Sequence, residues 1–259
     1  MKRLASALLW GAAAAFAQSG LTPPLVGVIP NVSGRPALVY GVANSFVLGS
    51  SWDWERVEHT GRYLLAHREA EAAGGQLAVL TLEGEVLCRQ GVPSGTVRFG
   101  FSASGEDALA WFAAPGQLVR VRGCTMEPLP LEPPVTDAVI SLGYLADGRI
   151  GLVVRRSEGL ALLEFSPEGR LEIESPLVNL SEPVVLLRDG TLAFAESHTV
   201  VLRSAEGFEL RIVTEAPVKA LHDLGPGWLL VALEGPWGRR AVRLRAGQLE
   251  QYYLPGTTP

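Results

Sequence analysis

The sequence predicts an all-β fold built from a repeated unit. Three observations support this prediction. Glycine (29) and proline (18) are frequent among the 259 residues. No stretch keeps the 3.6-residue apolar period of an amphipathic helix. Glycine-centred turns recur about every 40 residues, and each is followed by an apolar segment. Short strands between regularly spaced turns are typical of all-β proteins.

The first series of turns places one glycine in each of five segments. Its members are HTGRYLLA, SGEDALAWFA, ADGRIGLVV, RDGTLAFA and GPGWLLVAL, with turn glycines Gly61, Gly105, Gly148, Gly190 and Gly227. Successive glycines are 44, 43, 42 and 37 residues apart. Glycine suits these positions because it accepts the positive φ that short hairpins require.

A second series interleaves with the first. Its members are LAVLTLEGEVLCR, LVRVRGCTMEPL, LALLEFSPEGRLEIE, VVLRSAEGFELRI and AVRLRAGQLEQYYL, with turn glycines Gly84, Gly123, Gly169, Gly207 and Gly247. Successive glycines are 39, 46, 38 and 40 residues apart. Each member reads strand, tight turn, strand. The two series therefore define a unit of four strands, a to d, with the first glycines at the a–b turn and the second at the c–d turn.

The composition of the strands orders this unit from inside to outside. The b strands, such as ALAWF and IGLVV, are apolar almost throughout, whereas the d strands, such as RLEIES and FELRIV, alternate with charge. Apolar strands are covered on both faces, and alternating strands are half solvated. This is the pattern of a β-propeller blade. Over residues 52–255 the chain resembles the bacterial exported β-propellers with degenerate repeats. A β-sandwich or a pair of β domains is the alternative fold.

We expect six blades rather than five. The first series advances about 41.5 residues per unit, and the chain after residue 17 is long enough for nearly six such units. Residues 18–51 contain the strand-like segments LVGVI, ALVYGVA and SFVLG. They form an incomplete sixth blade, or they supply closing strands beside the C-terminal LEQYYL.

The N-terminal residues have the pattern of a secretory signal peptide. Lys2 and Arg3 precede the apolar run LASALLWGAAAAFA, which ends in the A-x-A sequence of Ala15–Ala17. The run is shorter than the roughly 20 residues of a spanning helix. An uncleaved N-terminal anchor is the alternative. We therefore expect residues 1–17 to be cleaved, residues 18–259 to form one domain, and the product to be periplasmic or extracellular.

The charge of the mature chain limits its partners. Cleavage after residue 17 removes two basic residues and changes the formal net charge from −5 to −7. Nucleic-acid binding depends on basic side chains that neutralise phosphates, so an acidic chain without a basic run argues against it. No later segment is apolar enough to span a bilayer. We expect a monomer that does not insert into membranes once the signal is cleaved.

The candidate ligand-binding residues lie on one face of the predicted propeller. The d–a and b–c loops share this face, and they are irregular where the other turns are short: HREAEAAGG (67–75), EPLPLEPP (127–134), SPLVNLSEP (175–183) and EGPWGRR (234–240). We call it the loop-rich face. Variable loops on a rigid scaffold usually carry binding. The candidates are Trp52, Asp53, Trp54, Arg68, Trp237, Arg239 and Arg240.

The segment SSWDWE at residues 50–55 does not mark a WD repeat. Asp53 precedes the a–b glycine Gly61 by eight residues, so the Trp-Asp pair lies at the start of strand a, and the other units lack it. Two roles remain for the rings of Trp52 and Trp54. They fill the gap toward the N-terminal neighbouring blade, or they contact a sugar, a peptide or a partner protein.

No motif of catalysis or metal binding is evident. Asp53 and Glu55 are two residues apart on one strand, a separation that suits the paired carboxylates of a glycosidase, but adjacent charges are more often a surface pair. The four histidines show no metal-ligand spacing. We therefore expect no metal and no cofactor. The leading function is non-catalytic binding of a protein or of a small ligand such as a glycan. The alternative is a hydrolase or lyase acting on a carbohydrate or lactone in the central channel.

The two cysteines are predicted to be free thiols. Cys88 stands four residues past its c–d glycine, and Cys124 stands one residue past its own. On neighbouring outer strands this gives an axial offset of about 10 Å. A disulfide requires Cα atoms within about 7 Å of each other.

Overall fold

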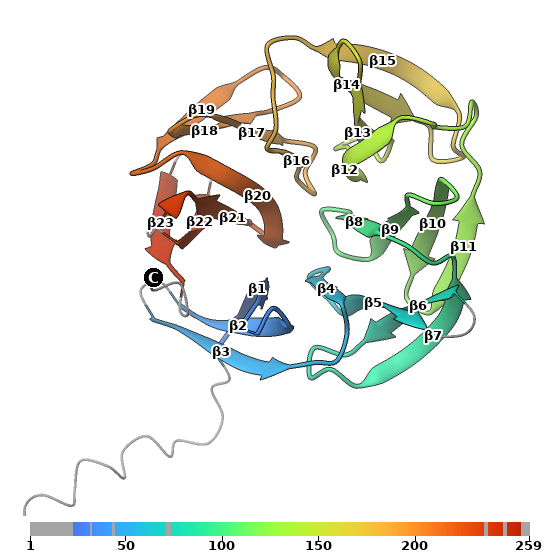
Figure 1. Cartoon of the computed structure of the whole chain (residues 1–259), viewed down its shortest axis with the longest axis horizontal. Helices are drawn as coiled ribbons and strands as arrows, with labels where there is room; N and C mark the ends of the chain where they lie inside the picture. The colour runs from blue at the N-terminus through green and yellow to red at the C-terminus, as the bar shows by residue number, and fades with distance from the viewer. Residues whose placement is uncertain are drawn as a thin grey trace, which may run out of the picture.

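Six antiparallel sheets surround a central channel in a computed structural model of the chain (Figure 1). The structure describes residues 23–31, 33–42, 45–70, 74–235, 238–245 and 248–254. Each sheet is a blade, and the first strand of each blade lies innermost, beside the first strands of its neighbours. The predicted six-bladed β-propeller is therefore confirmed. The expected signal peptide at residues 1–17 lies outside the described residues.

Five blades have four strands, and blade 1 has three in the described part of the chain. Blades 1 to 3 contain β1 (Leu25–Pro30), β2 (Pro36–Val42), β3 (Ser45–Ser51), β4 (Arg56–His59), β5 (Leu64–Ala70), β6 (Gly74–Leu80), β7 (Val86–Val92), β8 (Val97–Phe101), β9 (Asp107–Phe112), β10 (Gln117–Arg122) and β11 (Thr125–Leu129). Blades 4 to 6 contain β12 (Ala138–Tyr144), β13 (Ile150–Arg156), β14 (Gly159–Phe165), β15 (Leu171–Leu177), β16 (Val184–Leu186), β17 (Leu192–Glu196), β18 (Thr199–Arg203), β19 (Glu209–Val213), β20 (Val218–Gly225), β21 (Trp228–Leu233), β22 (Arg239–Arg245) and β23 (Gln248–Tyr253).

The glycine turns occupy the predicted places. Each glycine of the first series lies between the first two strands of a blade, and all have positive φ. Gly84, Gly123, Gly169 and Gly207 lie between third and fourth strands, whereas Gly247 is outside the described residues. A small polar side chain often closes the turn. The Thr60 hydroxyl accepts the N–H groups of Arg62 and Tyr63, and Ser166 does the same for Glu168 and Arg170.

The hydrophobic core is divided into six clusters, one between each pair of neighbouring blades. The second strand of a blade contributes most, because both of its faces are covered: Leu152, Val153 and Val154 of β13 are fully buried. The outer strands behave as their alternating sequences predict, and β19 exposes all but one of its residues. In the part of the chain that the structure describes, no helix has the length and apolar character needed to cross a bilayer.

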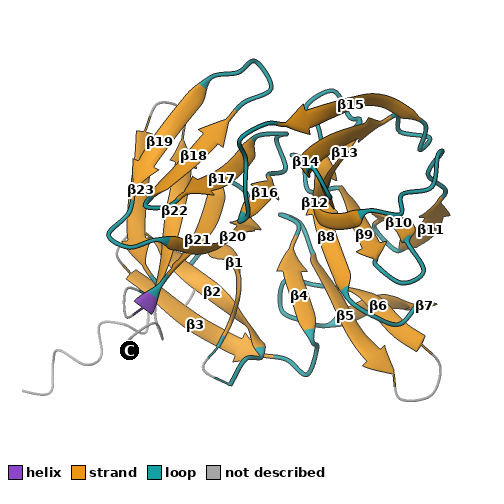
Figure 2. Cartoon of the chain, turned by 45° about the horizontal axis from the view of Figure 1, so that its top comes forward, coloured by secondary structure: helices purple, strands orange, loops and turns teal. Residues whose placement is uncertain are grey.

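Blade 1 runs in the opposite sense to the others. Gly27 of β1 packs so closely on the carbonyl of Leu224, at the end of β20, that a Cβ would lie 1.8 Å from that oxygen. At the other end of β1, the Pro30 carbonyl oxygen accepts a hydrogen bond of 2.7 Å from Arg239. The strand of Arg239, β22, starts level with the start of β20. The strands β1 and β20, which lie side by side in Figure 2, are therefore antiparallel. The chain must leave blade 1 at the face where β4 begins. With three strands instead of four, it reaches that face only if β1 starts at the opposite face. Residues 25–51 thus form a blade of their own, blade 1, which completes the six blades. They do not supply closing strands beside the C-terminal segment, where β23 pairs with β22.

The prediction of two free thiols was wrong, because Cys88 and Cys124 form a disulfide with Cα atoms 5.8 Å apart. Gly84 and Gly123 do lie in the turns between the third and fourth strands of blades 2 and 3, as predicted, but the two turns differ in length. The β6–β7 turn closes with the Leu80–Val86 pair and the β10–β11 turn with the tighter Arg122–Thr125 pair. Twist also accumulates toward the outer strands of a blade. Successive residues of an outer strand therefore move partly toward the neighbouring blade and only partly along the propeller axis. The predicted separation of the two cysteines counted every residue as a displacement along the axis.

Candidate functional site

Arg188 crosses the central channel at the face formed by the a–b turns. It lies in the β16–β17 turn of blade 5, and its guanidinium binds both carboxylate oxygens of Asp223 on β20, at 2.8 and 3.1 Å. It also donates to the carbonyl oxygens of His59 and Thr60 at the end of β4, in blade 2 across the ring. Its guanidinium carbon lies 4.9 Å from the centre of the Phe101 ring. Only 7% of the Arg188 side chain is exposed. The channel is therefore blocked at this face.

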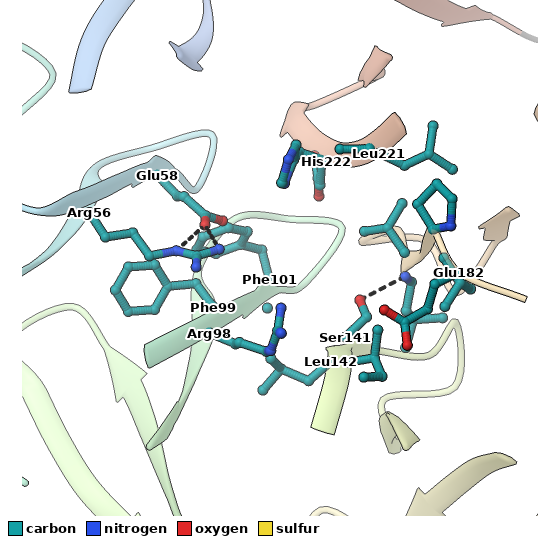
Figure 3. A pocket seen from close by; sticks show the side chains of 18 of the residues that line it. Arg56, Glu58, Arg98, Phe99, Phe101, Ser141, Leu142, Glu182, Leu221 and His222 are labelled. Carbon is teal, nitrogen blue, oxygen red and sulfur yellow. Dashed lines mark hydrogen bonds and ion pairs between the residues drawn. The ribbon is translucent and has the colours of Figure 1, made fainter. Parts of the chain in front are cut away.

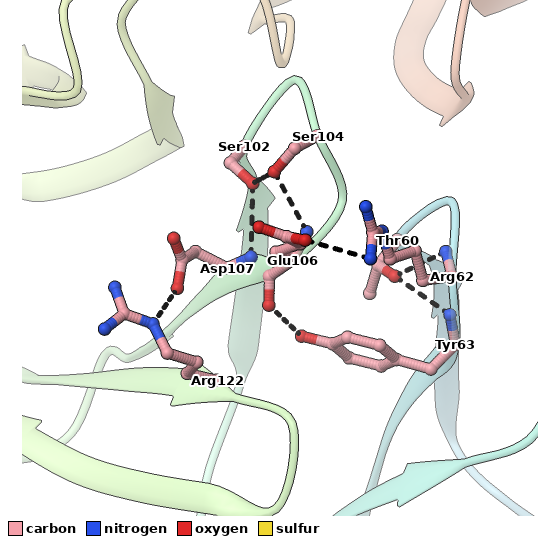
Figure 4. A network of polar contacts seen from close by, with 8 residues as sticks. All are labelled: Thr60, Arg62, Tyr63, Ser102, Ser104, Glu106, Asp107 and Arg122. Carbon is pink, nitrogen blue, oxygen red and sulfur yellow. Dashed lines mark hydrogen bonds and ion pairs between the residues drawn. The ribbon is translucent and has the colours of Figure 1, made fainter.

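The a–b turns of blades 2 and 3 strengthen the same face (Figure 4). Arg62 forms an ion pair of 2.9 Å with Glu106, and the Tyr63 hydroxyl donates to the carbonyl oxygen of Glu106. Gly105 packs against the Thr60 carbonyl, and a Cβ there would lie 2.3 Å from that oxygen. These contacts hold the turns that receive the Arg188 side chain.

On the other side of Arg188 the channel forms a cavity of about 330 Å³ that opens toward the loop-rich face. Its walls come from the innermost strands of blades 2 to 6. A larger cavity of about 660 Å³ adjoins it between blades 6 and 1 and shares five of its polar and charged residues. These shared residues are Arg56, Glu58, Lys219, His222 and Asp223. Figure 3 shows Arg98, Glu182 and His222 directed into the first cavity.

The carboxylates that line the channel are all engaged by arginines. Glu58 forms an ion pair of 2.5 Å with Arg56, Glu182 pairs with Arg155, and Asp223 pairs with Arg188. Burial raises the pKa of Asp223 above its ordinary value, and Arg188 and the Gly225 N–H oppose that rise.

Three basic side chains remain. Among the described residues, Arg98, Lys219 and His222 have no hydrogen-bond partner and no carboxylate at ion-pair distance. Enclosure lowers the pKa of His222 most, and the positive charges of Arg56, Arg239 and Arg98 lower it further. The pKa of Arg98 is also lowered, first by burial and then by Arg56. Burial is the main cause of both shifts, and the neighbouring arginines add to it.

Four of the residues predicted for ligand binding lie together, beside the channel rather than in it. Trp52, Asp53 and Trp54 form the connection between β3 and β4, and Arg68 lies near the end of β5. All four line a cavity of about 600 Å³ on the loop-rich face. The Arg68 guanidinium stacks on the Trp54 ring at 4.8 Å. Both tryptophans also pack on the cluster between blades 1 and 2, and Trp52 lies against Gly84. The ring of Trp52 therefore fills the blade gap, one of the two roles expected from sequence.

The structure separates Arg239 from Arg240. They are successive residues at the start of β22, so their side chains point to opposite faces of the sheet. Arg239 lines the cavity between blades 6 and 1. Arg240 is buried between blades 5 and 6, where it stacks on Tyr253 at 3.6 Å and pairs with Glu215 at 3.7 Å. Trp237 lies outside the described residues.

The two acidic residues considered as a catalytic pair have different neighbours. Asp53 is exposed and lies 3.7 Å from Arg35. Glu55 reaches His67 and Glu69, and the possible ligand atoms of these three residues all lie within 4.8 Å of one another.

The binding residues predicted from the sequence lie mainly on loops and loop ends, whereas the channel residues lie on the innermost strands. Their signal was present in the innermost strands, where single polar residues interrupt apolar runs: Arg98 in TVRFGF, Ser141 in VISLGY, and Lys219 with His222 in VKALHDL. In a four-stranded blade the innermost strand faces the channel along one edge. A polar residue there is a candidate for the channel wall. Of these residues, Ser141 has a structural partner, since its hydroxyl accepts the N–H of Leu186.

Comparisons with known proteins agree on the architecture. No family model and no curated protein matches the sequence. Among solved structures, a nidogen/laminin complex matches with a TM-score of 0.59 and 10% identity over 91% of this chain and 95% of the other. A streptogramin B lyase matches with a TM-score of 0.52 and 13% identity over 91% and 85%. A protein of unknown function from Bacteroides caccae matches with a TM-score of 0.53 and 14% identity over 85% and 90%.

At 10 to 14% identity these likenesses show the fold alone. The chain is a six-bladed β-propeller with a channel closed at one face.

Proposed function

We propose that this chain is a binding protein that takes a small anionic ligand, carrying a carboxylate or a phosphate, into its channel from the loop-rich face. The observation that supports the proposal is the set of unpaired basic side chains, Arg98, Lys219 and His222, around a cavity whose own carboxylates are paired. Charge-assisted hydrogen bonds to an anion would satisfy these donors. The low-dielectric walls would strengthen the attraction.

The closed end of the channel favours binding over passage. Arg188 leaves the loop-rich face as the entrance, and the neighbouring cavity lined by Trp52, Asp53, Trp54 and Arg68 could extend contacts to the rest of a larger ligand. Aromatic and charged groups of this kind suit a glycan or a peptide. An acidic sugar or an acidic peptide would use both parts of this face.

The proposal includes export. The pattern of residues 1–17 supports it, and so does the Cys88–Cys124 disulfide, because disulfides persist mainly in oxidising compartments. N-terminal sequencing of the protein recovered from its host tests this part directly. A mature N-terminus at Gln18 is the expected result, and an intact Met1 would overturn it.

Binding is tested by calorimetric titration of inorganic phosphate, citrate and acidic glycan fragments into the protein. The variants Arg98→Gln and Lys219→Gln should each weaken binding about tenfold or more, the loss expected for one charge-assisted contact. Arg89→Gln is the matched control, because Arg89 is exposed on β7, outside the channel. Equal affinity in all three variants would refute the proposal.

A lyase or hydrolase acting on an anionic substrate is the second candidate. It rests on His222, which faces the channel with a lowered pKa and is therefore uncharged near neutral pH. A neutral imidazole can accept a proton while the nearby cations stabilise the developing negative charge. Turnover of a bound ligand that disappears in His222→Gln, with binding retained, would establish this candidate over simple binding.

A further inference from the structure

We infer that Glu55, His67 and Glu69 form a binding site for a divalent cation of the Zn²⁺ type on the loop-rich face. The possible ligand atoms of these residues, one from each, lie within 4.8 Å of one another. Glu55 also lines the cavity that adjoins the channel, whereas His67 and Glu69 line neither of those two cavities.

The strand geometry explains the cluster. His67 and Glu69 are two residues apart on β5, so their side chains share one face of the sheet. Arg68 lies between them, on the other face, where it stacks on Trp54. Glu55 is held beside β5 because its backbone N–H donates to the carbonyl oxygen of His67 at 3.1 Å. Three ligands from β5 and from the residue that precedes β4 therefore converge.

His67 gives independent evidence of a missing partner. It is 2% exposed, and its Nε2 is buried without a hydrogen-bond partner among the described residues. A buried polar atom without a hydrogen-bond partner destabilises the fold, so it is expected to have one. Such an imidazole next to two exposed carboxylates has the composition of a site for Zn²⁺, which takes nitrogen and oxygen ligands together.

One carboxylate is already oriented. Glu69 Oε1 accepts the backbone N–H of Gly95 at 2.5 Å, in the connection from blade 2 to blade 3, and this leaves its second oxygen for an ion. Contacts of this kind commonly fix metal ligands. Tetrahedral ligands about 2.1 Å from the ion are about 3.4 Å apart. Small rotations of the two exposed glutamates would close the present spacing to that value.

The test is calorimetric titration of Zn²⁺ alone into the tag-free protein, without chelating buffer. One ion per chain is expected, and Glu55→Gln and Glu69→Gln should each weaken its binding at least tenfold. Glu206→Gln is the matched control, because Glu206 is an exposed carboxylate in the c–d turn of blade 5. Both glutamates are exposed, so these variants should fold. Glu69 lines neither cavity of the anion site, so Glu69→Gln should leave phosphate binding unchanged.

A second measurement identifies the imidazole. Zn²⁺ should shift the NMR ring signals of His67 and leave those of His59 and His198 unchanged. The inference is overturned if Zn²⁺ does not bind at 0.1 mM, a concentration set well above the Kd expected of a protein site. It is also overturned if both glutamine variants bind as tightly as the unmodified chain, or if the shifted signals belong to His222 or His198.

Discussion

Arg188 and Asp223 form a buried, bidentate ion pair between blade 5 and blade 6, and the same guanidinium donates to two carbonyl oxygens of blade 2. An ion pair this buried matters for stability mainly because of the cost of removing one of its partners. Removing one partner strands the other charge away from water. Through those two carbonyl oxygens Arg188 also connects blades 5 and 6 to blade 2, with which neither shares a core cluster, so it ties the ring across its centre.

Arg188→Gln should lower the free energy of unfolding by about 3–5 kcal/mol, because Asp223 would remain buried without its partner. Urea denaturation followed by circular dichroism measures the change. Arg188→Lys should recover only part of the loss, since an ammonium cannot bind both carboxylate oxygens and two carbonyls at once.

The double variant Arg188→Gln/Asp223→Asn provides the internal check. It should be less destabilised than the sum of the two single variants, because it leaves no charge stranded. Arg203→Gln is the surface control: Arg203 pairs with Glu209 in a partly exposed position, and such pairs contribute about 0–1 kcal/mol. Additive single losses in the double variant would show that the two residues act independently.

The stability should fall as the pH falls from about 6.5 to about 4, because of His59. Burial, and then the nearby charge of Arg188, lower the pKa of His59 to about 4, and its side chain has both ring nitrogens buried without partners. Between that value and the ordinary pKa near 6.5, the unfolded chain binds more protons than the folded one, so protonation favours unfolding.

The full effect of that shift is about 3 kcal/mol, reached near pH 4. Denaturation midpoints measured at half-unit pH intervals give the slope, and His59→Asn should flatten it. His67 contributes in the same direction, since burial also lowers its pKa. A slope unchanged by His59→Asn would assign the pH dependence to other groups.

The propeller fold could be predicted from the sequence because the patterns that indicate it are local and recur in every unit. A turn such as that at Gly148 needs a positive φ, and the strand after it needs two covered faces, so each unit shows both features independently of its neighbours. The blade number followed from the period. The reversed blade 1 could not be predicted in this way, since nothing local to residues 25–51 records the direction of β20.

The site was predicted only where adjacency in the chain was enough. Trp52, Trp54 and Arg68 come together because the connection from β3 to β4 enters blade 2 beside the end of β5. Arg239 and Arg240 are adjacent in sequence, but the alternation of β22 separates them, and their environments depend on the neighbouring blades. The pairing of Arg188 with Asp223 joins residues from two blades, and no spacing within either one indicates it.

The disulfide should contribute about 4 kcal/mol to stability in a chain-entropy estimate for its 36-residue separation. The Cys88→Ser/Cys124→Ser variant measures this by urea denaturation. Mass spectrometry of the alkylated, non-reduced protein should show one intact bridge and no modified cysteine. Alkylation of both thiols in folded protein purified without reductant would contradict the bond.

The packing of Trp52 on Gly84 can be isolated with a matched pair of glycine substitutions. Gly84 and Gly207 occupy equivalent c–d turns with φ of +93° and +85°, so alanine meets the same backbone strain at both, about 1–2 kcal/mol. At Gly207 a Cβ has open space, whereas at Gly84 it would lie 2.3 Å from the Trp52 indole nitrogen. Gly84→Ala should therefore cost roughly 1–3 kcal/mol more than Gly207→Ala, the range for overpacking.

The fluorescence of the same two variants tests the role of the ring. Gly84→Ala should shift tryptophan emission to longer wavelength, because Trp52 must leave the gap between blades 1 and 2 and meet water, while Gly207→Ala should leave the spectrum unchanged. If the two variants have equal stability and equal spectra, Trp52 does not depend on this gap, and its ring is available for ligand contact. The expected inequality instead assigns Trp52 to packing and leaves Trp54, under Arg68, as the aromatic surface of this face.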